Sequence, residues 1–75
     1  MKTNTLPRIG TDAELVRELT RRVQAEYREL PGLSVTLVQA QRLLAVDAPT
    51  CAEVFERLTT QGVLRRTKEG RYVRS

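Results

Sequence analysis

Five basic side chains lie close together near the end of the sequence, in a segment that contains a single acidic residue. They are Arg65, Arg66, Lys68, Arg71 and Arg74. Residues 1–61 carry eight basic and eight acidic side chains, so the formal net charge of +4 falls entirely within residues 62–75. A cluster of basic side chains with few acidic neighbours is typical of a surface that binds a polyanion, most often nucleic acid. Taken alone, the charge is explained equally well by a solvent-exposed polar edge without a partner.

The sequence offers little for catalysis or metal binding. It contains no histidine, which is the commonest general base and the commonest metal ligand. Its one cysteine, Cys51, has no partner for an intrachain disulfide or for a Cys-His pair, and no glycine-rich phosphate loop is present. We therefore expect a protein that is not an enzyme and has no catalytic residue, metal or cofactor.

A chain of 75 residues has room for one small domain. We expect a single domain over 11–75, preceded by a flexible arm over 1–10 that is polar and contains Pro7 and Gly10. No apolar stretch resembles a signal peptide or reaches the length of a membrane span. The sequence therefore predicts a cytoplasmic, bacterial protein with no membrane contact.

The first element expected to position the basic cluster is a long amphipathic helix. The segment Thr11-Asp12-Ala13-Glu14 fits a capping box in which Thr11 opens the helix, and Pro31-Gly32 ends it. One apolar stripe follows helical spacing through Leu15, Val16, Leu19, Val23, Tyr27 and Leu30. Part of this stripe exceeds what a small core can cover. The helix is therefore the expected surface for a homodimer, through Leu15, Leu19, Val23 and Leu30.

Two shorter helices are expected in the middle of the chain. Residues 33–35 form either a small strand or an extended linker, and Thr36 then caps a helix that runs to Leu44, with Gln39 completing a capping box. Asp47 is expected to cap a third helix, which Gly62 ends. The spacing of Cys51, Val54, Phe55 and Leu58 predicts the buried face of this helix and an inert thiol at Cys51.

The last element is predicted to be a β-hairpin with strands over 63–67 and 71–74 and a turn over 68–70. Because side chains alternate in face along a strand, the five basic residues cannot all lie on one surface. Lys68 and Arg71, at the tip, are the expected phosphate contacts. Tyr72 is expected to pack on the third helix rather than to stack on a base.

Three segments together resemble a winged helix-turn-helix. They are Val35–Leu44, Asp47–Leu58, and Gln61–Arg66 with Glu69–Tyr72. The spacing over residues 12–74 is most similar to the DNA-binding domain of IclR-type regulators and more loosely to that of MarR-type regulators. The resemblance implies a mainly α protein with a small β-hairpin, in the order helix, short strand, helix, helix, strand, strand. It also implies a transcriptional regulator that places its third helix in a major groove and its basic wing on the flanking phosphates of double-stranded DNA.

Carried onto this sequence, the resemblance implies a set of DNA-binding residues. Thr36 would donate to a phosphate, Thr50 would approach the groove from the first turn of the third helix, and Arg57 would contact a base edge or phosphate. Glu53 would accept from a cytosine amine. The full set is Thr36, Thr50, Glu53, Arg57, Arg65, Arg66, Lys68, Arg71 and Arg74.

The sequence also departs from the family pattern. IclR-type regulators carry a ligand-binding domain after the wing, where this sequence stops, so no small-molecule effector is expected. Ala45 stands where the turn between the two helices often holds glycine. The outward positions of the third helix offer few groups that read bases, namely Ala48, Pro49, Thr50, Ala52, Glu53 and Arg57. The alternative is therefore a winged-helix module that binds a protein and not DNA.

Overall fold

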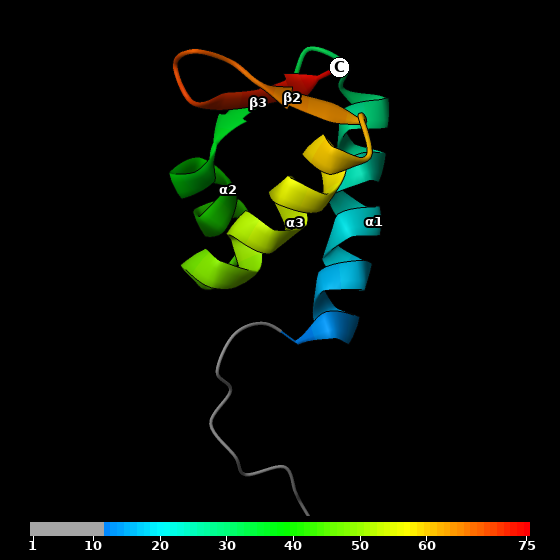
Figure 1. Cartoon of the computed structure of the whole chain (residues 1–75), viewed down its shortest axis with the longest axis vertical. Helices are drawn as coiled ribbons and strands as arrows, with labels where there is room; N and C mark the ends of the chain where they lie inside the picture. Colours follow the sequence, from blue (N-terminus) through cyan, green and yellow to red (C-terminus); the bar gives the residue numbers. More distant parts are fainter. Residues whose placement is uncertain (1–11) are drawn as a thin grey trace, which may run out of the picture.

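The computed structural model describes residues 12–75, and the predicted flexible arm over 1–10 and the predicted cap at Thr11 lie outside them. The elements follow the predicted order and form a mainly helical α+β structure (Figure 1). They are α1 (Ala13–Glu29), β1 (Ser34–Thr36), α2 (Leu37–Leu44), α3 (Ala48–Thr60), β2 (Leu64–Arg66) and β3 (Arg71–Arg74).

Helix α1 is capped by Asp12, one residue later than predicted. The Asp12 carboxylate accepts from the backbone N–H of Glu14 at 3.0 Å and of Leu15 at 3.4 Å, which satisfies amides that have no partner inside the helix. The predicted stripe faces the core at Val16, Leu19, Val23 and Tyr27, all of them buried. The expectation that Leu19 and Val23 stay available for a second copy is therefore wrong, because α3 of the same chain packs against this face.

The caps of α2 and α3 are those predicted. The Gln39 N–H donates to Thr36 Oγ1 at 3.1 Å, and the Thr36 N–H donates to Gln39 Oε1 at 2.9 Å, which completes the capping box. Asp47 accepts from the Thr50 N–H at 3.0 Å and starts α3. The turn between the helices passes through Ala45, whose φ of 56° and ψ of 47° lie in the left-handed region. Gly62, which follows α3, also has a positive φ, of 80°, as predicted.

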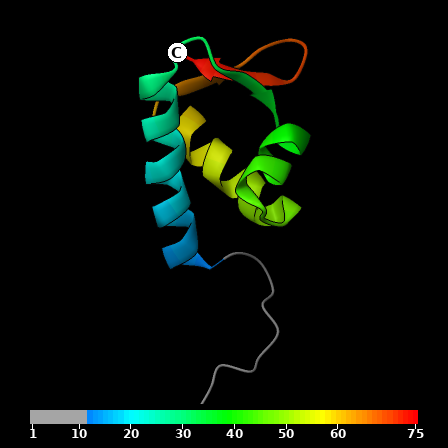
Figure 2. The same ribbon diagram turned by 180° about the vertical axis from the view of Figure 1, so that it is seen from behind.

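Residues 34–36 form a strand, which resolves the choice between strand and linker. The sheet is antiparallel with the order β1-β3-β2, so the last strand is central. Val35 lies opposite Tyr72, and Tyr72 lies opposite Arg66. The three helices of residues 12–75 all lie on one side of this sheet, and none of them lies on the other (Figures 1 and 2).

The core lies between the sheet and the three helices. Its largest fully buried side chains are Tyr27, Phe55, Leu58, Leu64, Val16, Val54 and Cys51. The predicted position of Tyr72 against α3 is confirmed, since its ring contacts Phe55 edge-on with a centroid distance of 5.1 Å. Burial of Cys51 is confirmed as well, and desolvation raises the pKa of its thiol. Within residues 12–75, no helix combines the length and the apolar character needed to cross a membrane.

Candidate functional site

The basic residues of the hairpin divide between the two faces of the sheet, as the strand alternation predicted. Residues directly opposite each other in an antiparallel sheet share a face. Arg65 therefore shares the outer face with Val73 and Ser34, and Arg71 shares it with Thr36. On the face toward the helices, the remaining two arginines flank the core residues: Arg66 pairs with Tyr72 and Arg74 pairs with Leu64.

The turn of the hairpin is closed by backbone bonds and leaves its charged side chains exposed. The Thr67 N–H donates to the Arg71 carbonyl at 2.7 Å, and the Gly70 N–H donates to the Thr67 carbonyl at 3.0 Å. Gly70 has φ of 81°, which the turn requires. Lys68 and Glu69 are exposed at the tip. The Arg71 guanidinium reaches across β1, where Nη1 donates to the Ser34 carbonyl at 3.4 Å.

The five hairpin cations have no acidic partner in the described part of the chain. Every acidic side chain of the sequence falls within residues 12–75, and the ion pair recorded there joins Arg57 to Glu53. Arg65, Arg66, Lys68, Arg71 and Arg74 are all exposed. Their positive charge therefore faces solvent and is available to an external anion.

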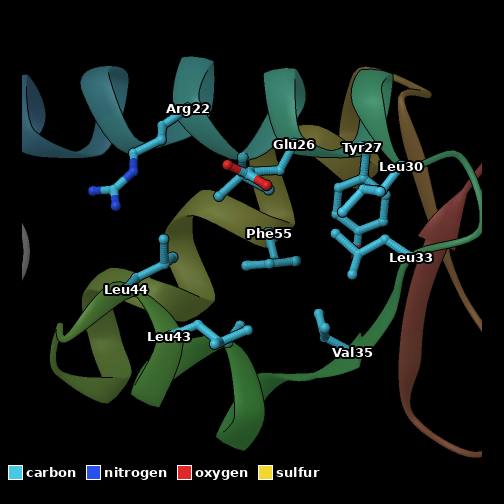
Figure 3. Close-up of a pocket in the computed structure, with 11 residues that line it drawn as sticks. Arg22, Glu26, Tyr27, Leu30, Leu33, Val35, Leu43, Leu44 and Phe55 are labelled. Carbon is cyan, nitrogen blue, oxygen red and sulfur yellow. The ribbon is translucent and has the colours of Figure 1, made fainter.

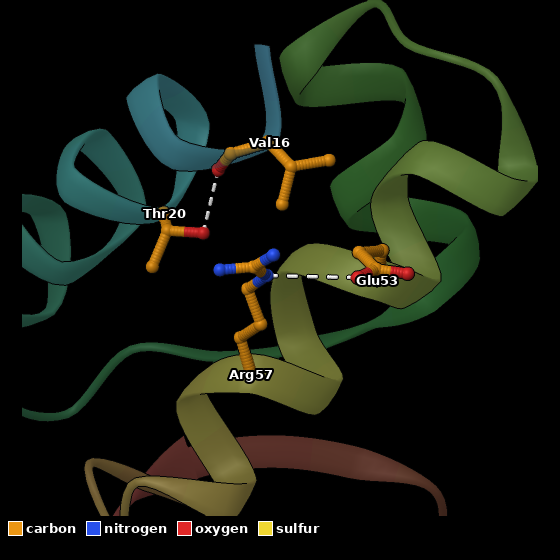
Figure 4. Close-up of polar contacts among 4 residues, drawn as sticks. All are labelled: Val16, Thr20, Glu53 and Arg57. Atoms are coloured by element: carbon orange, nitrogen blue, oxygen red, sulfur yellow. Dashed lines mark hydrogen bonds and ion pairs between the residues drawn. The ribbon is translucent and has the colours of Figure 1, made fainter. Parts of the chain in front are cut away.

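Two predicted contacts on α3, Glu53 and Arg57, face each other. Arg57 Nε lies 3.5 Å from Glu53 Oε2, and Figure 4 shows the guanidinium extending toward α1 near Val16 and Thr20. The Arg57 Nε atom is enclosed and makes no hydrogen bond within residues 12–75. The guanidinium thus lies at the junction of α1 and α3, while the Arg57 and Glu53 side chains remain 42% and 44% exposed. The spacing of four residues in the sequence is the signal that predicts such a pair.

Thr50 does not lie on the outward side of α3, contrary to prediction. Its side chain is only 5% exposed, and its N–H donates to the Asp47 carboxylate at 3.0 Å. Hydrogen bonds from the Thr50 hydroxyl and N–H lower the pKa of Asp47. Thr50 precedes Val54 by four residues and Leu58 by eight, so helical spacing already placed it on the buried face. Thr50 is therefore part of the helix cap and the core.

Thr36 caps α2 and also lies next to a residue of the hairpin. Its hydroxyl accepts from the Gln39 N–H, and its position in β1 lies opposite Arg71 in β3. The side chain is half-buried. Thr36 and Arg71 are thus the two predicted site residues from distant parts of the sequence that the sheet brings side by side.

The exposed side of α3 carries no basic residue. Its exposed positions are Ala48, Pro49, Ala52, Glu56, Thr59 and Thr60. Small and apolar side chains predominate there, and the one charged group, Glu56, is negative. This side presents no long amide or guanidinium group of the kind that makes bidentate contacts with base edges.

An apolar groove between α1 and α2 was not predicted. Phe55 of α3 lies at its floor, and the side chains that line it include Leu30, at the C-terminal end of α1, and Leu43 of α2 (Figure 3). The groove has a volume of about 320 Å³. Helical spacing placed Leu30 and Leu43 on apolar stripes, but the distance between α1 and α2 is set by tertiary packing.

The described residues contain no group of three or more side chains that suits a metal ion. The site is thus a set of cations on one hairpin, beside a helix whose exposed side is nearly neutral. Comparisons with models of known protein families, with curated proteins and with solved structures found no match to this chain.

Proposed function

We propose that this protein is a winged helix-turn-helix module that binds double-stranded DNA mainly through its phosphates. The observation that carries the proposal is the hairpin, where five exposed basic side chains have no acidic partner within residues 12–75. Arginine and lysine in such a group neutralise phosphates and release condensed counterions, which is the main source of affinity that does not depend on sequence.

The arrangement of elements supports the winged-helix interpretation. Three residues, 45–47, join α2 to α3, and the hairpin of β2 and β3 follows α3 directly. β1 pairs with β3 and completes a three-stranded sheet at the base of the hairpin. In this interpretation α3 is the recognition helix and the hairpin is the wing.

A duplex fits this surface better than a single strand. Single-stranded nucleic acids are bound by aromatic side chains on which bases stack. The chain has three aromatic residues, and all of them belong to the interior: Tyr27 and Phe55 are buried, and the Tyr72 ring packs on Phe55. The hairpin therefore offers cations without a stacking platform, which suits the regular phosphate array of a duplex.

The exposed side of α3 supports contact with the DNA backbone more than recognition of particular bases. Ala48, Pro49, Ala52 and Glu56 offer no bidentate group to a base edge. We therefore expect weak sequence preference and strong salt dependence. Contact with three to five phosphates gives a slope of log K against log salt of about −2.7 to −4.5.

Titration of a labelled duplex over a series of salt concentrations tests the proposal. Replacement of Arg66, Lys68 and Arg71 together by alanine should make the slope shallower by about 2.7, since about 0.9 is lost per phosphate contact. Arg17→Ala is the control, because Arg17 is an exposed arginine near the N-terminal end of α1, and that end of the helix lies away from the sheet (Figure 1). Absence of binding at low salt, or binding with no salt slope, would overturn the proposal.

A protein partner is the second candidate, and the exposed side of α3 favours it. That side is small, partly apolar and acidic at Glu56, which suits packing against another protein surface. A capture experiment distinguishes the two functions. A partner retained equally by the parent chain and by the triple hairpin variant, with no DNA binding by either, supports the protein-binding function.

A further inference from the structure

The groove between α1 and α2 is flanked by apolar side chains that the chain itself leaves in water. Leu30, which follows the last residue of α1, is 54% exposed, and Leu43 of α2 is 71% exposed. Both line the groove whose floor is Phe55 (Figure 3). Exposed large apolar side chains beside an apolar groove are typical of a surface that becomes buried on association.

The charged side chains of the same groove are self-complementary. Arg22 and Glu26 line it from α1, one helical turn apart, and neither makes an ion pair within residues 12–75. In a two-fold symmetric contact, residue i of one copy meets residue j of the other, and j meets i. An axis that crosses two antiparallel α1 helices midway between positions 22 and 26 therefore places each Arg22 opposite Glu26 of the other copy.

We propose that this groove is the interface of a homodimer and that its occupant is a second copy of this chain. In this register Leu43, which lies between Arg22 and Glu26 along the groove (Figure 3), faces the groove of the other copy, and its burial removes apolar surface from water. Leu30 lies six residues from the axis, at the end of the contact. The two Arg22–Glu26 pairs at the rim fix the antiparallel register. This interface differs from the one predicted from sequence, because it uses the side of α1 next to α2 and leaves Leu15 outside.

The dimer leaves the basic hairpins free. None of the hairpin cations lines the groove. A dimer would therefore present two hairpins, which doubles the number of phosphate contacts one molecule can make. Dimerisation itself does not depend on DNA binding and is measured without DNA, so the two proposals fail separately.

Sedimentation equilibrium of the full chain over about 1 µM to 1 mM tests the proposal in the range of weak to moderate association. The average mass should rise with concentration from 8.5 kDa toward twice that value. Leu43→Glu should raise the dissociation constant of the dimer by at least about tenfold, because it brings a carboxylate into an apolar interface. Val38→Glu is the matched control, since Val38 lies on the same helix, is 58% exposed and does not line the groove.

A charge exchange tests the symmetry. Arg22→Glu and Glu26→Arg should each weaken association alone, because each places like charges opposite one another. An equimolar mixture of the two variants should restore it, because in the mixed dimer both contacts pair a glutamate with an arginine. Circular dichroism of each variant confirms that the helices are retained.

Three results would overturn the homodimer. The first is an average mass that stays at 8.5 kDa over the whole concentration range, which would indicate that a different protein binds the groove. The second is equal weakening by Leu43→Glu and Val38→Glu. The third is a mixture of the two charge variants that associates no better than either alone.

Discussion

The hydroxyl of Tyr27 in α1 donates to the backbone carbonyl of Tyr72 in β3 at 2.6 Å, across 45 residues of sequence. The Tyr72 ring packs edge-on against Phe55 of α3. One residue of the central strand is thus tied to α1 through its main chain and to α3 through its side chain. Together with the buried Leu64 of β2, this residue positions the basic hairpin on the helices.

Removal of the Tyr27 hydroxyl should loosen this connection. Tyr27→Phe keeps the ring in the core but removes this hydrogen bond to the Tyr72 carbonyl, so we expect a loss of about 1 kcal/mol in the free energy of unfolding. Urea denaturation measures the change. Tyr72→Phe is the control, with an expected change below about 0.5 kcal/mol, because the Tyr72 hydroxyl makes no hydrogen bond within residues 12–75. Equal stability of Tyr27→Phe and the parent would contradict the role of this bond.

The same tyrosine predicts alkaline sensitivity. Burial raises the pKa of Tyr27 to about 12, whereas a tyrosine in an unfolded chain titrates near 10. The folded state keeps a proton that the unfolded state releases, so this contribution to stability is complete below pH about 10 and is lost as pH rises toward about 12. Urea midpoints measured across this range should fall more steeply for the parent than for Tyr27→Phe. Parallel pH profiles for the two proteins would show that Tyr27 is not the group responsible.

The turn between α2 and α3 offers a site for stabilisation. Ala45 has φ of 56°, a conformation that is unfavourable for a residue with a Cβ. Ala45→Gly should raise the free energy of unfolding by about 0.5–1 kcal/mol, after the greater freedom of glycine in the unfolded chain is subtracted. Ala52→Gly, at an exposed position inside α3, is the control and should lower it by about 1 kcal/mol. Thermal unfolding of both variants checks the opposite signs, and a destabilised Ala45→Gly would argue against strain at this turn.

The position of a cation along the hairpin should decide its effect on DNA binding. Lys68 lies in the turn at the tip, whereas Arg74 lies at the other end of β3, next to the C-terminus (Figure 1). Lys68→Ala should reduce the salt slope by about 1, as expected for the loss of one phosphate contact. Arg74→Ala should reduce it by less than about half as much. The opposite order, measured by the same duplex titration, would place the contact surface at the C-terminal end of the hairpin.

Features that depend on neighbours in sequence were predictable. The caps at Thr36 and Asp47 follow from side chains that satisfy amides within three residues, and the positive φ values of Gly62 and Gly70 follow from the lack of a Cβ. The inward position of Tyr72 follows from strand alternation. Helical spacing predicted the buried face of α3 and, applied to Thr50, would have predicted that this residue is buried too.

Features that depend on how the helices pack were not predictable. Arg57 and Glu53 were predicted as separate contacts on α3, and both side chains are partly exposed, but only the contact of α1 with α3 places the Arg57 guanidinium at the junction of the two helices. The same packing buries Leu19 and Val23, which the sequence left available for a second copy. No local pattern specifies which part of an apolar stripe the rest of the chain will cover.

The sequence by itself determined the order of the elements, their caps and the concentration of charge in the last fourteen residues, because each of these arises from residues that are close along the chain. Only the tertiary structure decided that β3 is the central strand and that an apolar groove stays open between α1 and α2. Both depend on contacts between elements that are far apart in the sequence. The spacing of apolar residues along one element shows which face is apolar, but not which other element will cover it.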